Sequence, residues 1–260
     1  MSAAGPAGTS GTWAVVTGAS DGIGAAVARR LAARGDDLVL VARRQDRLEE
    51  VARAAAAHGV RTLVVAADLA EPAGVRRVLE ETAGLDVGLL VAAAGFGSGG
   101  DLVDADVETE ASMLRVNCEA VVRLCHGFGS RFVARGGGDI VLLSSIVAFQ
   151  GVPGQATYSA TKAFVQAFAE ALGRELRPRG VRVLSVAPGP VRSGFGERAG
   201  LDLTAGAPPD DVARALVSRL GRPGTLFPGR LSKVLRAALA GLPRGLRTTV
   251  LGRVVAGMRA

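Results

Sequence analysis

The feature that most constrains the fold is an apolar run that passes through a glycine-rich loop directly into a helical segment. Residues 12–17 predict a buried strand, residues 18–24 read Gly-Ala-Ser-Asp-Gly-Ile-Gly, and residues 25–34 predict a helix. Glycines let the backbone approach a ligand closely, and the free N–H groups of a helix N-terminus attract anions. The segment therefore predicts an anion site on an α/β fold; a tight turn without a ligand is the alternative.

Apolar runs and helical segments alternate along the rest of the chain. Strands are expected at 37–42, 61–69, 87–95, 140–143, 181–187 and 224–228, and helices at 44–57, 72–83, 107–134 and 163–172. This alternation predicts one Rossmann-type, doubly wound, three-layer α/β/α domain with a parallel sheet. We expect a flexible tail at 1–11, the domain at 12–228 and a basic, amphipathic helical extension at 229–260.

The positive charge of the chain gathers in that extension. The net charge is +7, yet ten lysines and arginines and no acidic residue follow Asp211. This predicts a local basic surface and not a nucleic-acid-binding protein. Two short helices, at 231–242 and 246–258, suit a membrane surface or an acidic partner such as an acyl carrier protein. The alternative is a helical hairpin packed on the domain or across an oligomer interface.

Three polar residues follow the strand at 140–143 with a spacing that suggests chemistry. Ser145 stands at the end of that strand, Tyr158 is the only tyrosine, and Lys162 lies four residues after Tyr158. On a helix, Tyr158 and Lys162 share one face, and a nearby cation favours the phenolate. The pair can then exchange a proton near neutral pH, with Ser145 bonded to the same substrate oxygen. The alternatives are a solvated helix face and, for Ser145, a cap on the next turn.

Together, Ser145, the Tyr-x-x-x-Lys pair and the Thr-Gly-x-x-x-Gly-x-Gly pattern at 17–24 resemble the short-chain dehydrogenase/reductase family. The resemblance implies an NADP(H)-dependent oxidoreductase that reduces a ketone or aldehyde to an alcohol, or the reverse. Tyr158 would give the proton, Ser145 would orient the carbonyl oxygen, and Lys162 would lower the tyrosine pKa and bind the ribose. Asn117 matches the family's helix asparagine, which would hold a proton path to Lys162.

The resemblance also assigns the cofactor contacts. Arg43 and Arg44 follow the second strand, where an acid would select NAD and arginine accommodates the NADP phosphate. Asp21 in the glycine loop argues against NADP, because many NADP-binding relatives have a basic residue there. The other interpretation of the two arginines is that they form the solvated start of the next helix. The cofactor-binding residues expected are Gly18, Ser20, Asp21, Gly22, Ile23, Gly24, Arg43, Arg44, Asp68, Leu69, Ala94, Gly95, Tyr158, Lys162, Pro188, Gly189, Val191 and Ser193.

The chain departs from the family pattern after the fourth strand. Residues 92–95 read Ala-Ala-Ala-Gly where Asn-Asn-Ala-Gly is usual, so polar support is lost, and a cofactor-binding regulator with little catalysis stays open. Ser193 stands where threonine is usual. Residues 194–209 are expected to form a mobile substrate lid. Phe96, Phe149 and Phe195 are expected to line an apolar pocket. A lipid-like or 3-oxoacyl substrate would join an enzyme to a membrane role of the basic extension.

The remaining features bear on where the protein works. Cys118 and Cys125 are seven residues apart on one expected helix, which is too far for a disulfide, and no metal-ligand spacing occurs. No signal peptide or membrane span is expected. These observations predict a cytoplasmic protein that holds no metal. The basic extension could bring this protein to a membrane. The resemblance implies a homo-oligomer, a dimer or tetramer.

Overall fold

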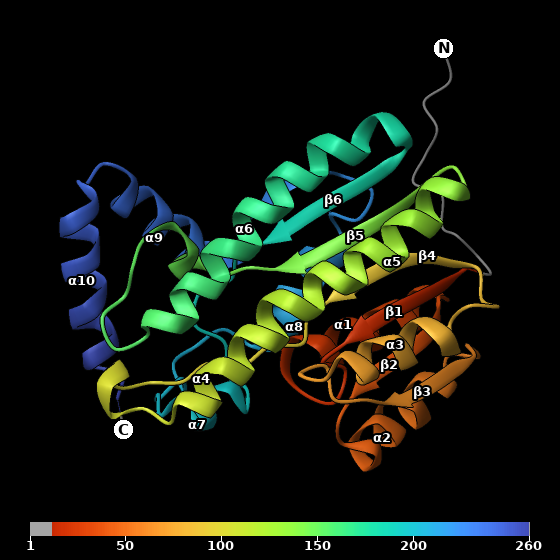
Figure 1. The fold of residues 1–260 in the computed structure, drawn as a ribbon, viewed down its shortest axis with the longest axis horizontal. Helices are drawn as coiled ribbons and strands as arrows, with labels where there is room; N and C mark the ends of the chain where they lie inside the picture. Colours follow the sequence, from red (N-terminus) through yellow and green to blue (C-terminus); the bar gives the residue numbers. More distant parts are fainter. Residues whose placement is uncertain (1–11, 260) are drawn as a thin grey trace.

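The computed structural model describes residues 12–259, so the tail predicted at 1–11 lies outside the described residues. Within them, seven parallel strands form one sheet in the order β3-β2-β1-β4-β5-β6-β7 (Figure 1). The strands are β1 (Trp13–Thr17), β2 (Asp37–Ala42), β3 (Thr62–Ala66), β4 (Val87–Ala92), β5 (Gly138–Leu143), β6 (Val181–Val186) and β7 (Gly224–Leu226). The predicted doubly wound parallel sheet is confirmed.

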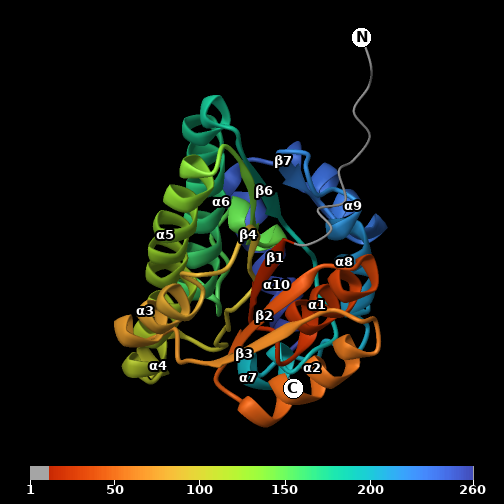
Figure 2. The same ribbon diagram turned by 90° about the vertical axis from the view of Figure 1, so that its right-hand side faces the viewer.

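Helices cover both faces of the sheet, as Figure 2 shows. One face packs against α3 (Pro72–Glu81), α5 (Ala120–Ala134) and α6 (Ala156–Leu176), and the other against α1 (Gly22–Arg34), α2 (Gln45–Ala56) and α8 (Pro209–Val217). The central strands are buried on both faces, which explains why they read as unbroken apolar runs. The strand order reverses between β1 and β4, and ligands of open α/β sheets bind at such a point.

The helix predicted over 107–134 contains an irregular turn. It consists of α4 (Val107–Leu114), a π-helical turn (Arg115–Glu119) and α5. The π turn adds a residue to one helical turn, and such bulges occur mostly at functional sites. Asn117 lies in this turn and is 1% exposed. The periodicity of the sequence gave no sign of the bulge, because a single extra residue leaves the apolar spacing on either side intact.

The glycine loop is as tight as the sequence predicts. Gly18 has φ +67°, and a Cβ on Gly24 would stand only 2.3 Å from the carbonyl oxygen of Gly18. Only glycine allows the N-terminus of α1 to come this close to the end of β1. The loop therefore aims the free N–H groups of α1 at the carboxyl edge of the sheet.

The extension forms a helical hairpin that packs on the domain. Helices α9 (Gly229–Ala240) and α10 (Arg244–Ala256) contribute Leu235, Leu251 and Val255 to an apolar cluster with the segment after β5. Of the two interpretations of this basic segment, the packed hairpin accounts for its inner face. None of the helices in residues 12–259 has the length and apolarity needed to cross a bilayer. Both cysteines are free thiols, as expected.

The predicted lid is partly helical. Residues 194–209 include the short helix α7 (Phe195–Ala199), and Ala207 near their end pairs with Val191. The middle of the segment is tied to the residues after α10, since the Asp202 N–H donates to the Met258 carbonyl at 2.7 Å. The lid and the hairpin therefore meet, and their apolar side chains pack in the same cluster.

Candidate active site

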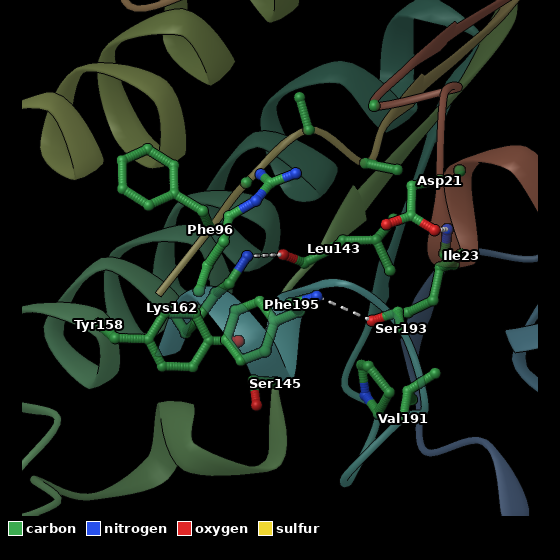
Figure 3. Close-up of a pocket in the computed structure, with 18 of the residues that line it drawn as sticks. Asp21, Ile23, Phe96, Leu143, Ser145, Tyr158, Lys162, Val191, Ser193 and Phe195 are labelled. Carbon is green, nitrogen blue, oxygen red and sulfur yellow. Dashed lines mark hydrogen bonds between the residues drawn. The ribbon is translucent and has the colours of Figure 1, made fainter. Parts of the chain in front are cut away.

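A cavity of about 450 Å³ lies at the carboxyl ends of the central strands. Its walls come from the segments that follow β1, β2, β3, β4, β5 and β6, together with the lid and the hairpin. Every residue predicted to bind the cofactor lines this one cavity, and so does Ser145. Figure 3 shows part of the lining, with Asp21 and Ile23 on one side and Tyr158 and Lys162 on the other. Of the predicted site residues, only Asn117 lies behind the wall.

The first part of the wall is the N-terminus of α1. Asp21 is the N-cap of that helix, and its carboxylate accepts the Gly22 N–H at 2.6 Å. An aspartate is among the residues preferred at this position, because its oxygen satisfies a free helix N–H. The residue that opposed an NADP preference in the sequence therefore has a local structural role. It also lies 4.0 Å from the Arg44 guanidinium, which offsets its charge.

The two arginines after β2 face the same end of the cavity. The Arg44 guanidinium donates to the Ser20 hydroxyl at 3.3 Å, and Arg43 lies 3.9 Å from the Asp68 carboxylate. Both guanidinium groups are more than one third exposed, so each keeps N–H donors that are open to solvent. Two guanidinium groups and the Ser20 hydroxyl thus lie on the cavity wall, beside the carboxylates of Asp21 and Asp68. This arrangement matches the needs of a phosphate group, which arginine binds with paired N–H donors.

The exit of β4 keeps its support despite the missing asparagines. The Thr17 hydroxyl accepts the N–H groups of Ala93 and Ala94, at 3.1 and 3.0 Å. A Cβ on Gly18 would stand 2.9 Å from the Ala93 carbonyl oxygen, so the two loops are in direct contact. The expected loss of polar side chains is real, but the main chain is still held by Thr17. Sequence reasoning had included Thr17 only as part of the glycine pattern.

Asn117 holds the next part of the wall from behind. Its side-chain oxygen accepts the Phe96 N–H at 3.1 Å, and its amide donates to the Phe96 carbonyl at 2.9 Å and to the Thr161 hydroxyl at 3.0 Å. One buried side chain thus joins the loop after β4 to helix α6. A Cβ on Gly95 would lie 3.0 Å from the Asn117 oxygen and 3.4 Å from the Lys162 ammonium. Asn117 is therefore close to Lys162, although it does not line the cavity.

The predicted catalytic residues come together on α6 and the turn before it. The Lys162 ammonium donates to the Leu143 carbonyl at 2.9 Å and lies 5.7 Å from the centre of the Tyr158 ring. The Tyr158 ring packs on Phe195, with ring centres 5.1 Å apart (Figure 3). The Ser145 hydroxyl accepts the Val147 N–H at 3.3 Å, which is the capping role considered for it. Ser145 and Tyr158 line the same cavity, and the bond from Ser145 to a substrate oxygen stays a prediction.

Burial sets the electrostatics of this cluster. It raises the pKa of the Tyr158 phenol to about 12, an effect partly opposed by the hydrogen bond with Ser145. It lowers the pKa of the Lys162 ammonium from 10.5 to about 8. The expected lowering of the phenol pKa by Lys162 is therefore not what the structure shows. The physical reason is that a buried phenolate loses its hydration, which costs free energy. The Lys162 ammonium is turned toward the Leu143 carbonyl, so its attraction to the phenolate does not offset that cost.

The end of the cavity away from the glycine loop and the arginines is apolar. Most of the residues that line this end were not predicted from the sequence. Phe96 and Phe195 line it as expected, whereas Phe149 does not and instead packs on Phe227 at 5.6 Å. The additional apolar lining comes from the turn after β5, the lid and the hairpin: Ile146, Val147, Leu201, Leu203, Leu235, Leu251, Val254, Val255 and Met258. The helical periodicity of the hairpin could have indicated a buried face, but not which surface would cover it.

A comparison with known families decides what this arrangement is. The family model described as short chain dehydrogenase matches residues 12–203. The chain belongs to the short-chain dehydrogenase family. The match includes the glycine loop, Asn117, Ser145, Tyr158 and Lys162, and it ends inside the lid. Helix α8, strand β7 and the C-terminal hairpin lie beyond it.

Individual relatives agree with this assignment. The chain is 37% identical over 182 residues to the very-long-chain 3-oxoacyl-CoA reductase of Podospora anserina, covering 68% of this chain and 54% of the relative. It is 32% identical over 174 residues to the 7beta-hydroxysteroid dehydrogenase of Collinsella aerofaciens, covering 66% of each. The chain thus spans between about half and two thirds of these curated relatives.

A solved structure extends the similarity to the whole domain. The short-chain dehydrogenase of Sphingobium yanoikuyae in complex with NADPH has a TM-score of 0.80 and 32% sequence identity to this chain. The match covers 90% of this chain and 97% of that one. It therefore includes much of the chain beyond residue 203.

The residues of this short-chain dehydrogenase fit a dinucleotide cofactor. The helix N-terminus at Gly22 would hold the pyrophosphate, Ser20 and the two rim arginines a 2′-phosphate, and Lys162 the ribose next to the nicotinamide. Gly22 has φ +53°, and a Cβ there would lie 3.1 Å from the Ser193 Cβ. The glycine loop is thus in direct contact with the segment after β6, and both line the cavity. The structure describes a single chain, so the expected homo-oligomer and the cytoplasmic location stay predictions.

Replacing Asn117 by alanine should lower the free energy of unfolding by about 2 kcal/mol. The substitution removes one buried and two partly buried hydrogen bonds and takes the Asn117 partner from both main-chain groups of Phe96, which is the costly case for polar groups. Urea denaturation followed by circular dichroism would measure the change. Cys118→Ala, one position further in the same turn, is the control and should cost less. Equal stability of Asn117→Ala and the wild type would refute the structural role of the Asn117 hydrogen bonds.

Proposed function

We propose that this chain is an NADP(H)-dependent carbonyl reductase of bulky apolar ketones, or catalyses the reverse oxidation. The observation that carries the proposal is that one cavity joins a dinucleotide-type cradle to the Ser145, Tyr158 and Lys162 cluster and to an apolar end. A binding protein without catalysis would need the cradle alone. The proton donor, the cation and the hydroxyl together support an enzyme.

Each residue has a distinct part in the proposed reaction. When bound, the nicotinamide cofactor supplies the hydride that the carbonyl carbon takes up. Tyr158 gives its proton to the carbonyl oxygen, which becomes the alcohol, and a phenol with a pKa of about 12 carries that proton at neutral pH. Ser145 donates a hydrogen bond to the same oxygen. Lys162 holds the ribose and favours the transient phenolate, while Asn117 positions the wall behind Lys162.

The apolar end supports a substrate with a large hydrocarbon body. Phe195, Leu201 and Leu203 of the lid face Leu251, Val255 and Met258 of the hairpin around the position next to Tyr158. Apolar lining of this extent favours apolar ligands, because little desolvation of polar groups opposes their binding. The two curated relatives are named for a 3-oxoacyl-CoA and for a hydroxysteroid, both of which contain such a body. We infer that a ketone of the lipid or steroid class is the substrate.

Replacing Tyr158 by phenylalanine should lower kcat by about 100-fold or more, because general acid catalysis contributes roughly that factor. The phenylalanine ring keeps the packing on Phe195, so the dissociation constant for NADPH should change by no more than about threefold. Steady-state kinetics on a ketone panel and fluorescence titration with NADPH would measure the two effects. Turnover retained by the variant would refute the assignment of the proton donor.

Replacing Arg44 by alanine should reduce kcat/KM for NADPH about tenfold and leave kcat/KM for NADH nearly unchanged. The guanidinium next to Ser20 is proposed to bind the phosphate that distinguishes the two cofactors. The matched control is Arg47→Ala, which removes an exposed arginine of the same helix that pairs with Glu50 at 3.0 Å. A wild-type enzyme that prefers NADH would contradict the NADP(H) proposal at the outset.

A second function is supported by the outer face of α10. Leu246, Val250 and Val254 follow one another at intervals of four residues and are 48%, 36% and 42% exposed. They form an apolar stripe on a part of the chain with ten cations and no acid after Asp211. Val254 also lines the cavity, so one end of the stripe adjoins it. We propose that this face rests on an anionic membrane surface, from which an apolar ketone would reach the cavity.

The double substitution Leu246→Gln and Val250→Gln should reduce sedimentation with phosphatidylglycerol vesicles at least fivefold. Removing two apolar contacts weakens insertion into the interface, whereas the basic charge is unchanged. The control pair is Leu114→Gln and Val122→Gln, which are 48% and 38% exposed on α4 and α5 and should have no effect. Equal sedimentation of the two double variants, or none by the wild type, would eliminate the membrane role.

A further inference from the structure

A buried serine of the hairpin contacts the turn on the cofactor side of the cavity. Ser232 on α9 is 3% exposed, and its hydroxyl oxygen accepts the Gly189 N–H at 2.8 Å. The fit at this point is close, because a Cβ on Gly189 would stand 3.1 Å from that oxygen. Ser232 lies beyond residues 12–203, so the part of the chain that matches the family model does not contain it.

The turn that Ser232 holds is part of the cavity wall. Pro188 and Gly189 follow β6, and both line the cavity. On its other side the turn is tied to the catalytic segment, since the Ile146 N–H donates to the Pro188 carbonyl at 2.9 Å. The turn is thus held between the residue after Ser145 and the hairpin. Removing either bond would give it freedom to move relative to the cavity.

The same hairpin also covers the substrate end. Leu235 lies three positions after Ser232 on the same helix and lines the cavity, as do Leu251 and Val255 of α10. Residues three apart on a helix share a face, so one face of α9 contacts both the turn and the cavity. The hairpin therefore touches the two ends of the site at once. A movement of the Pro188–Gly189 turn would therefore shift the hairpin, and with it the apolar side chains at the substrate end of the cavity.

We infer that Ser232 is a positioning residue that couples the C-terminal hairpin to cofactor binding by fixing the Pro188–Gly189 turn. The inference rests on the proposed use of NADP(H), whose nicotinamide end would meet this turn. A hairpin that strengthens cofactor binding must itself be stabilised by the cofactor to the same extent, because coupling between two equilibria is reciprocal. Ser232 acts through the main chain of Gly189 and needs no contact with the cofactor.

The first test is NADPH binding to Ser232→Ala in the full-length chain. Loss of one hydrogen bond to a main-chain N–H should raise the dissociation constant about three- to tenfold, measured by fluorescence titration without substrate. KM for NADPH should rise by a similar factor while kcat stays within about twofold. The matched control is Ser218→Ala, an exposed serine whose hydroxyl bonds only the Ala215 carbonyl of its own helix. An unchanged dissociation constant in a folded Ser232→Ala variant would overturn the inference.

The second test uses the wild-type protein and does not depend on how the variant folds. Trypsin can cleave the hairpin after Arg236, Arg244 and Arg253, which are all exposed. Saturating NADPH should slow cleavage at these sites at least threefold, and Ser232→Ala should lose that protection. Mass spectrometry of the released C-terminal peptides gives the rates. Wild-type protein that binds NADPH without protecting the hairpin refutes the coupling alone, whereas failure to bind NADPH refutes the proposed cofactor.

Discussion

Parallel pairing of buried strands is the constraint on which the rest of this structure depends. Because all seven strands of the described sheet run the same way, their carboxyl ends meet at one edge, and each strand must be followed by a crossover that leaves from that edge. Residues far apart in the sequence, such as Gly22, Arg44 and Ser145, therefore line one cavity. The reversal of strand order between β1 and β4 opens the space between the crossovers that the cavity occupies.

Residues that come directly after a strand could be predicted from the sequence, whereas features that depend on packing between distant segments could not. The glycine loop, Arg43 and Pro188 come after apolar runs, so their place at the sheet edge is set by the strands. The π turn at Asn117 has no local signal, because its stabilising partners, Phe96 and Thr161, are remote in the chain. The position of the hairpin could not be predicted either. An amphipathic pattern indicates that one face of a helix is covered, but not which surface covers it.

The electrostatics of the cluster correct a simple picture of the tyrosine–lysine pair. A cation four residues away was expected to acidify the phenol, yet Lys162 points to the Leu143 carbonyl and burial raises the phenol pKa. A neutral phenol is the form that can give a proton, so the site is suited to reduction in its resting state. Burial also lowers the lysine pKa to about 8, which leaves the ammonium largely charged at pH 7. The cation can therefore stabilise the phenolate at the moment when that charge develops, where it counts for catalysis.

The missing asparagines after β4 bear on whether the chain is an enzyme at all. Their loss removes side chains, but the N–H groups of Ala93 and Ala94 still share the Thr17 hydroxyl, and Asn117 holds the N–H and the carbonyl of Phe96 further along the loop. Main-chain support thus persists where side-chain support is gone, so the loop can keep the close approach that Gly95 permits. Asn117, the only asparagine in the chain, and the Lys162 ammonium both lie next to Gly95. Lys162 and the Asn117 contacts would also serve a protein that only bound a dinucleotide. The Tyr158 phenol on the cavity wall, with the Ser145 hydroxyl on the same wall, has no part in holding the cofactor in the proposed reaction, so this pair favours catalysis over a regulatory role.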